Sequence, residues 1–301
     1  LLVGHGVAPD LIEGALDAWQ SFFDQSMEAK APFAAPPELD GLVGYTPFGV
    51  QALAYTSGEA SPPDLLEAYS VGREDTQGAD YDEYRAWFPA NVWPDRAIRA
   101  ATEALEAELG RVAQIVLGAM SIALDLPDDW LATRCERAVV THRANHYRRE
   151  PGVDVLPDQQ RLGAHTDYGV MTLLVADPVP GLEVRRGGDW IEITPPLGGI
   201  ICNVGDMLSM WTNDQWVSTL HRVVPPPAGT EAGATRRSIA RFLDGDPSVL
   251  IEPIPHCVPV GEEPRYPPVN AGEWLMAKIV GGQAAQPVEL HAGGVTGATN
   301  R

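Results

Sequence analysis

The sequence is poor in basic residues, and it has no apolar run long enough to cross a membrane. Its 301 residues contain 21 Lys and Arg against 41 Asp and Glu, a formal net charge of −20. Such a charge repels phosphate backbones and anionic lipid surfaces, so we expect no nucleic-acid partner and no membrane partner. The apolar run Ile115 to Leu124 is too short for a bilayer span and predicts a buried helix segment.

Cysteine is also scarce, and the three present, Cys135, Cys202 and Cys257, are widely separated and form no Cys-x-x-Cys pair. This spacing argues against a disulfide scaffold and predicts free thiols in a reducing cytoplasm. The 45% of hydrophobic residues suffices for a large core, and we expect a single domain over residues 1–301. Because the first residue is Leu1 rather than Met, we also expect a trimmed N-terminus.

Residues 1–138 are predicted to form a region of helices and loops. A helix is expected from Pro9 to about Lys30, with Asp10 as its cap. A longer helix is expected to start near Pro94, and between the two lies a stretch rich in Gly, Pro and Asp, from Pro36 to Trp93, that predicts loops with short elements. The longer helix carries an apolar stripe at steps of three and four residues: Leu105, Leu109, Val112, Val116 and Met120.

Residues 139–301 have a different texture, with short β-rich runs separated by turn residues. Arg186 to Asp189 predicts a hairpin turn, and Asn203 to Asp206 predicts another around Gly205. Many short strands between such turns favour a sandwich or barrel, so the fold class expected is mainly β with flanking helices. The predicted strands are Val170–Val175, Gly181–Arg185, Trp190–Ile193, Ile200–Val204, Met207–Trp211, Val217–Val224 and Arg236–Phe242.

Of the seven histidines, only His165 is followed two residues later by a carboxylate, Asp167. Residues i and i+2 of a strand share a face, so this pair could hold one cation, although such a pair is expected about once by chance. A third candidate ligand, His221, lies in a later β run. Two imidazoles and one carboxylate leave coordination positions open, which suits non-haem Fe(II) handling O₂ better than structural zinc.

Strand alternation places Arg236 and Ser238 on one face of the last predicted strand, with Arg237 and Arg241 on the other. A buried guanidinium requires an anion, and its planar fork of donors matches a carboxylate. A dicarboxylate co-substrate would satisfy this pair, but an internal carboxylate could also pair with Arg236.

At these residues the sequence resembles the iron- and 2-oxoglutarate-dependent oxygenase superfamily, and within it the isopenicillin N synthase-like branch. The similarity extends over most of the chain. The matching stretches are Gly163–Gly169, Gly199–Leu208, Ser218–Val224 and Arg236–Ile239, with two more before the β-rich part, Val3–Val7 and Asn91–Pro94.

The resemblance implies a double-stranded β-helix, or jelly roll, over residues 139–301, with the N-terminal helices packed against it and the family's first core strand preceding Leu1. It implies that Fe(II) is held by the three catalytic residues His165, Asp167 and His221. It also implies that Arg236 and Ser238 hold the distal carboxylate of 2-oxoglutarate. The segment around Asn145 and Tyr147 resembles the family's Asn-x-Tyr-Pro element, whose Asn and Tyr often reach the co-substrate, but Arg148 stands where the proline usually is.

The function implied is that of a cytoplasmic Fe(II)- and 2-oxoglutarate-dependent dioxygenase in specialised metabolism. It would hydroxylate or otherwise oxidise an unactivated C–H of a small organic substrate with O₂, releasing succinate and CO₂. One alternative is an isopenicillin N synthase-like oxidase that uses no 2-oxoglutarate, and another is a non-catalytic sensor that binds the metal and 2-oxoglutarate. The stretch Gly41 to Tyr55, with Tyr45 and Phe48, is a candidate for substrate contacts, and the oligomeric state is left open.

Overall fold

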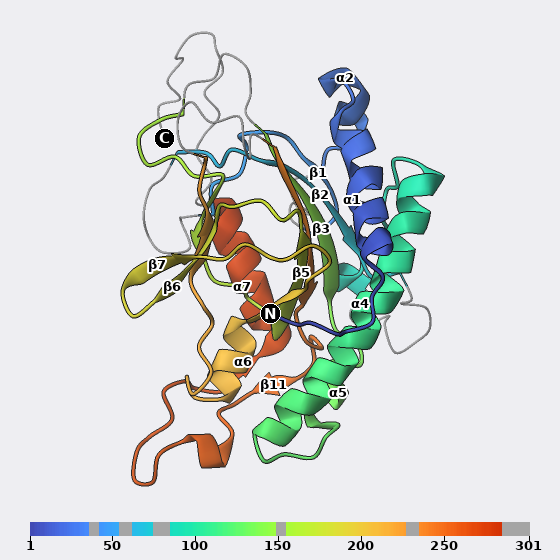
Figure 1. Ribbon diagram of the computed structural model, residues 1–301. Coiled ribbons are helices and arrows are strands. Elements are labelled where there is room, and N and C mark those ends of the chain that lie inside the picture. The colour runs from blue at the N-terminus through green and yellow to red at the C-terminus, as the bar shows by residue number, and fades with distance from the viewer. Residues whose placement is uncertain (36–41, 54–61, 75–84, 149–154, 227–234, 285–301) are drawn as a thin grey trace, which may run out of the picture.

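The fold is a jelly roll of two packed antiparallel sheets, with helices covering one side (Figure 1). The computed structural model describes residues 1–35, 42–53, 62–74, 85–148, 155–226 and 235–284. The larger sheet has the order β1-β2-β3-β10-β5-β8, and the smaller sheet the order β4-β9-β6-β7. This confirms the predicted fold class.

The strands of the larger sheet are β1 (Gly44–Thr46), β2 (Glu67–Gly72), β3 (Val140–Tyr147), β5 (Met171–Ala176), β8 (Ile201–Val204) and β10 (Arg236–Leu243). Those of the smaller sheet are β4 (Leu162–His165), β6 (Leu182–Arg186), β7 (Asp189–Glu192) and β9 (His221–Val223), and a separate pair is formed by β11 (Leu250–Ile251) and β12 (Val269–Asn270). The turn between β6 and β7 is the predicted hairpin, with Gly187 and Gly188 both at positive φ. Strands β1 and β2 come from the stretch predicted as loops with short elements, and they extend the larger sheet beyond β3.

The helices are α1 (Pro9–Phe23), α2 (Met27–Lys30), α4 (Arg96–Ala123), α5 (Trp130–Thr133), α6 (Asp206–Trp211) and α7 (Ala271–Ala284). Short 3-10 turns occur at Ala31–Phe33, Arg85–Trp87 and Pro255–Cys257. Helices α1 and α4 lie side by side against the outer face of the larger sheet (Figure 1). Within the described part of the chain, no helix is both long and apolar enough to cross a membrane.

The two long helices begin and pack differently from the prediction in detail. Helix α1 is capped by Ala8 with Pro9 in its first turn, so Asp10 is not the cap, whereas α4 is capped by the Asp95 side chain, which accepts the Ile98 N–H. The apolar stripe of α4 is buried through Leu105, Leu109 and Val112 and then continues through Leu117 rather than Val116. Since a straight helix repeats every 3.6 residues, residues at successive steps of four, such as Val116 and Met120, rotate away from the buried face. The expectation that 115–124 is a buried segment is therefore wrong in part, because Ile115 and Ile122 are each 62% exposed.

Two predicted strands are also corrected by the structure. Residues 207–211 form helix α6 instead of a strand, and every one of them is buried. The predicted strand is wrong because hydrophobic periodicity cannot distinguish a short, fully buried helix from a buried strand. The run 217–224 contributes only the three residues of β9 to a strand. All three cysteines are free thiols, as predicted.

The space between the sheets is lined by few apolar side chains. A large apolar cluster joins α1 and α4 to the outer face of the larger sheet. The inner cluster is much smaller and consists of Leu66, Ala68, Tyr147, Leu182 and Val223. Beside this inner cluster the two sheets enclose the candidate polar residues.

Candidate metal and co-substrate site

The structure brings His165, Asp167 and His221 together. His165 is the last residue of β4 and His221 the first of β9, and the two are Cα partners across the smaller sheet. Each of the three residues offers one potential ligand atom, and these three atoms all lie within 4.8 Å of one another. His221 Nε2 is 3.7 Å from Asp167 Oδ1. Asp167 lies beyond the end of β4, so it reaches the histidines through the following loop and not through the strand alternation that the sequence suggested.

Both imidazoles are oriented by the carbonyl of a residue two positions earlier in the chain. His165 Nδ1 lies 2.8 Å from the Gly163 carbonyl oxygen, and His221 Nδ1 lies 2.9 Å from the Thr219 carbonyl oxygen. A carbonyl only accepts, so each Nδ1 carries the proton and each Nε2 presents a lone pair. Burial, with a smaller electrostatic contribution from the neighbouring His221, lowers the pKa of His165 to about 4, which keeps the His165 imidazole neutral and able to bind a metal.

The Asp167 carboxylate is held by neighbours from two other strands. Asn203 Nδ2 donates to Asp167 Oδ2 over 2.8 Å, and Thr172 adds a second side-chain hydrogen bond. Burial alone would raise the pKa of Asp167, but His221, His165 and these hydrogen bonds outweigh burial and lower it. Oδ2 is thereby engaged while Oδ1 faces His221. From the sequence, Asn203 is predicted only as part of a turn, because its contact with Asp167 depends on the pairing of β8 with β5.

Arg236 and Ser238 lie on the inner face of β10, as strand alternation predicted. Their partners on β3 are Tyr147 and Asn145. On the opposite face, Arg237 pairs with Asp177, 3.0 Å away. The Arg236 residue is 1% exposed, and its Nε and Nη2 have no hydrogen-bond partner among the described residues. Burial lowers the pKa of Arg236, so a charged guanidinium here requires an anion to offset its loss of hydration.

Asn145 and Tyr147 line the same recess. Asn145 Nδ2 is 3.5 Å from Ser238 Oγ, and Asn145 Oδ1 is buried with no hydrogen-bond partner among the described residues. The Arg236 Cζ lies 5.3 Å from the centre of the Tyr147 ring. The guanidinium, the Ser238 hydroxyl and the Asn145 amide N–H groups can each donate to a carboxylate in this recess.

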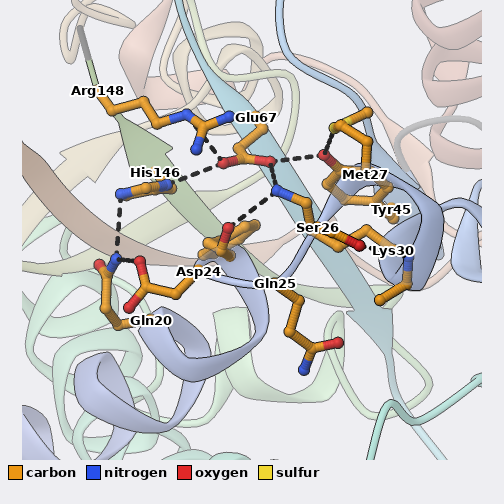
Figure 2. A network of polar contacts seen from close by, with 12 residues as sticks. Gln20, Asp24, Gln25, Ser26, Met27, Lys30, Tyr45, Glu67, His146 and Arg148 are labelled. Carbon is orange, nitrogen blue, oxygen red and sulfur yellow. Dashed lines mark hydrogen bonds and ion pairs between the residues drawn. The ribbon is translucent and has the colours of Figure 1, made fainter. Parts of the chain in front are cut away.

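The residues just outside this recess face away from it. Arg148, in the place of the family's proline, turns toward Glu67 with Nε 3.5 Å from Oε1, and His146 Nδ1 lies 3.0 Å from the same oxygen (Figure 2). Tyr45 also hydrogen-bonds to Glu67, so it belongs to the contact between helix and sheet rather than to the cavity. His291, one of the seven histidines of the sequence, lies outside the described residues.

Comparisons with known proteins agree with the geometry. The 2OG-Fe(II) oxygenase superfamily model matches residues 138–245, and the model of the N-terminal region of non-haem dioxygenase in morphine synthesis matches residues 1–96. Validamycin A dioxygenase of Streptomyces hygroscopicus subsp. limoneus is 35% identical over 291 residues, covering 93% of this chain and 76% of that protein. Homoarginine-6-hydroxylase of Oryza sativa subsp. japonica is 30% identical, covering 92% of this chain and 83% of that protein.

Solved structures show the same relationship. A 2OG-Fe(II) oxygenase family protein of Caulobacter crescentus superposes with a TM-score of 0.77 at 31% identity, covering 91% of this chain and 87% of that chain. A full-length Neurospora crassa protein, crystallised in complex with alpha-KG, which is 2-oxoglutarate, also superposes with a TM-score of 0.77 at 28% identity. That match covers 91% of this chain and 84% of that chain. Sequence and structure therefore relate this chain to the same group of proteins.

Proposed function

The chain belongs to the 2OG-Fe(II) oxygenase superfamily, and we propose that His165, Asp167 and His221 bind its Fe(II). We further propose that Arg236 and Ser238 hold the distal carboxylate of 2-oxoglutarate. The observation that carries this assignment is the convergence of the three ligand groups beside a buried guanidinium whose Nε and Nη2 have no partner among the described residues. Two nitrogens and one oxygen form the donor set that suits ferrous iron with open coordination positions.

The reaction supported best is hydroxylation of an unactivated C–H of a small organic substrate. Bound iron and 2-oxoglutarate supply the oxidising chemistry: O₂ and 2-oxoglutarate are consumed, succinate and CO₂ are released, and the C–H becomes C–OH. The hydroxylases among the relatives support hydroxylation over desaturation or ring closure. The same group of relatives favours an oxygenase that consumes 2-oxoglutarate over the two alternatives, which are an oxidase that uses no 2-oxoglutarate and a non-catalytic sensor.

The protein's own contribution is positioning in a site with little access to water. The Gly163 and Thr219 carbonyls fix the two imidazoles, and Asn203 fixes Asp167. Asn145 and Tyr147 complete the wall of the recess around the proposed carboxylate. Holding each group in place before the reaction removes the cost of orienting it during the reaction.

We place this activity in the cytoplasm and in specialised metabolism. The free thiols support a reducing compartment. Relatives such as validamycin A dioxygenase support a role in specialised metabolism. Fractionation of the native cells against marker proteins would test the compartment. Comparison of the small molecules in cells with and without the gene would test the metabolic role.

The assignment is tested by adding Fe(II) and 2-oxoglutarate to the protein without oxygen and following the visible charge-transfer band of a chelated keto acid. The parent protein should form the band. Arg236→Met should lower the affinity for 2-oxoglutarate at least about 30-fold, because truncating one partner of a buried charge pair costs several kcal/mol. His165→Ala should abolish the band.

Arg237→Gln is the matched control, because Arg237 follows Arg236 in the same strand but faces outward. It should bind 2-oxoglutarate as the parent does. A parent protein without a band, or an Arg236→Met variant with unchanged affinity, would contradict the assignment. Succinate formed in proportion to oxidised product would distinguish the proposed reaction from that of an oxidase.

A further inference from the structure

The loop that carries Asp167 is not held by the pairing of strands. The pairing of β4 with β9 ends at His165 and His221, and Asp167 lies two residues beyond the end of β4. The side-chain direction that a strand fixes therefore no longer applies to Asp167. The position of its carboxylate depends instead on the contacts of residues 166–169, which we call the 166–169 loop.

Helix α6 holds the backbone of the 166–169 loop on both sides of Tyr168. The Asp206 N–H donates to the Asp167 carbonyl oxygen over 2.8 Å, and the Met207 N–H donates to the Gly169 carbonyl oxygen over 2.9 Å. Both donors lie in the first turn of α6, where backbone N–H groups have no partner within the helix. The start of α6 and the loop are thereby joined through their backbones.

Helix α7 contacts both the loop and the start of α6. Trp274 Nε1 donates to the Tyr168 carbonyl oxygen over 3.2 Å, so the three carbonyls from 167 to 169 each accept a hydrogen bond from α6 or α7. One turn further along α7, Lys278 Nζ lies 3.2 Å from Asp206 Oδ2. The Thr166 hydroxyl donates to the same oxygen over 3.3 Å.

Trp274 and Lys278 form one contact surface, because residues four positions apart are neighbours on a helix. The Lys278 ammonium lies 4.6 Å from the centre of the Trp274 ring and 5.4 Å from the centre of the Tyr168 ring. Its ion pair with Asp206 is partly buried, with 28% and 14% of the two side chains exposed, so salt screens it only in part. Helix α7, which lies beside α6 in Figure 1, therefore contacts the loop through Tyr168 and α6 through Asp206.

From these contacts we propose that Trp274 and Lys278 are positioning residues for the metal ion. They hold the 166–169 loop so that the Asp167 carboxylate lies beside the two histidine ligands. This inference rests on the proposed function, since it concerns the same three ligands. The apparent affinity for a ligand is reduced by the fraction of molecules that are not in the binding-competent state, so a loop that opens more often lowers the affinity for the metal.

Hydrogen exchange of the metal-free protein tests whether α7 holds the loop. Trp274→Phe removes the indole N–H and keeps an aromatic ring, and Lys278→Met removes the charge and keeps most of the stem. In each variant the N–H groups of Asp206 and Met207 should exchange about 2- to 10-fold faster, the range for the loss of one hydrogen bond or one partly exposed ion pair. The N–H groups of β3 and β10 should exchange at the parental rate, which separates a local effect from a general loss of stability.

Titration of the metal-free protein with Co(II), a spectroscopic substitute for iron, tests whether the loop determines the metal affinity. Each variant should bind Co(II) about 2- to 10-fold more weakly. The direction is informative for Lys278→Met, because the loss of a positive charge near a cation site would by itself strengthen the binding of Co(II). Lys278→Arg keeps the ion pair and should restore most of the affinity. Glu273→Gln, at an exposed position of the same helix, is the matched control and should bind Co(II) as the parent does.

The inference is overturned if the Asp206 and Met207 N–H groups of either variant exchange at the parental rate. It is also overturned if either variant binds Co(II) as tightly as the parent or more tightly, or if Glu273→Gln weakens Co(II) to the same extent. Failure of the proposed function looks different, because the parent protein then binds Co(II) no better than His221→Ala does, while hydrogen exchange still reports whether α7 holds the loop.

Discussion

The buried ion pair between Lys30 and Glu67 predicts a large and pH-dependent loss of stability in Lys30→Met. Both side chains are 0% exposed, with Lys30 Nζ 2.6 Å from Glu67 Oε2 and 2.9 Å from the Phe23 carbonyl oxygen (Figure 2). Lys30 lies in α2 and Glu67 in β2, so this pair joins the helical layer to the larger sheet. Tyr45, His146 and Arg148 contact the same carboxylate and would remain in the variant.

The magnitude follows from burial and from the pKa of Glu67. Removing one partner of a buried pair costs about 3–5 kcal/mol, because the other charge remains buried. Burial alone would raise the pKa of Glu67, but hydrogen bonds from His146, Lys30 and Tyr45 lower it from 4.5 to about 2. A depressed carboxyl pKa stabilises the fold above pH 4.5, and this contribution, about 3 kcal/mol at most, is lost as the pH falls from 4.5 toward 2.

Urea unfolding of the parent and the variant at about pH 7 and about pH 3.5 measures both quantities. At neutral pH the variant should lose about 3–5 kcal/mol of unfolding free energy and roughly 10 °C in Tm. At the acidic pH the difference should shrink, because protonation of Glu67 in the variant removes the buried charge that has lost Lys30. The double variant with Glu67→Gln should recover part of the loss at neutral pH.

Arg111→Met serves as the control, since it breaks a half-exposed pair with Glu108 and should leave stability close to that of the parent. A loss in Lys30→Met below about 1 kcal/mol at neutral pH would refute the reasoning, since breaking a buried pair costs several times that amount. A loss of equal size at both pH values would show that packing around the methylene stem, and not the charge of Glu67, determines the effect.

Three further predictions concern the proposed metal site. His221→Ala removes one of three ligand groups, so titration with Co(II) as a spectroscopic substitute for iron should show no site, and activity should be lost. Asn203→Ala removes one of the two side-chain hydrogen bonds that hold the Asp167 carboxylate, and we expect metal affinity to fall about 10- to 100-fold in the same titration while the circular dichroism spectrum stays parental. Gly205→Ala would put a Cβ 2.2 Å from the Gly169 carbonyl oxygen, a contact with the backbone that only a shift of the loop can relieve. We expect a loss of about 2 kcal/mol or more in urea unfolding, and parental stability would contradict the observed approach.

The parts of the site that lie in one strand could be predicted from the sequence. Alternation along residues 236–242 placed Arg236 and Ser238 together and Arg237 on the other face, because a strand fixes side-chain direction with a period of two. The fold class followed from short β runs between turns. Helix α6 could not be recognised, since all five of its residues from 207 to 211 are buried and leave no periodic pattern.

Contacts that depend on which strands become neighbours were not accessible from the sequence. Asn203 reaches Asp167 because β8 pairs with β5, and neither residue carries a local signal of that pairing. The same limit applies to Arg143: all eight residues of β3 are buried, so no alternation of apolar and polar residues marks its inner face. Only the pairing of β3 with β2 and β10 distinguishes Arg143, which lies on the same face of β3 as Asn145 and Tyr147, from His146, which contacts Glu67 on the helical side. Contacts between neighbouring strands are therefore determined by strand order, whereas the proposed metal and co-substrate residues lie in short segments that the sequence already displays.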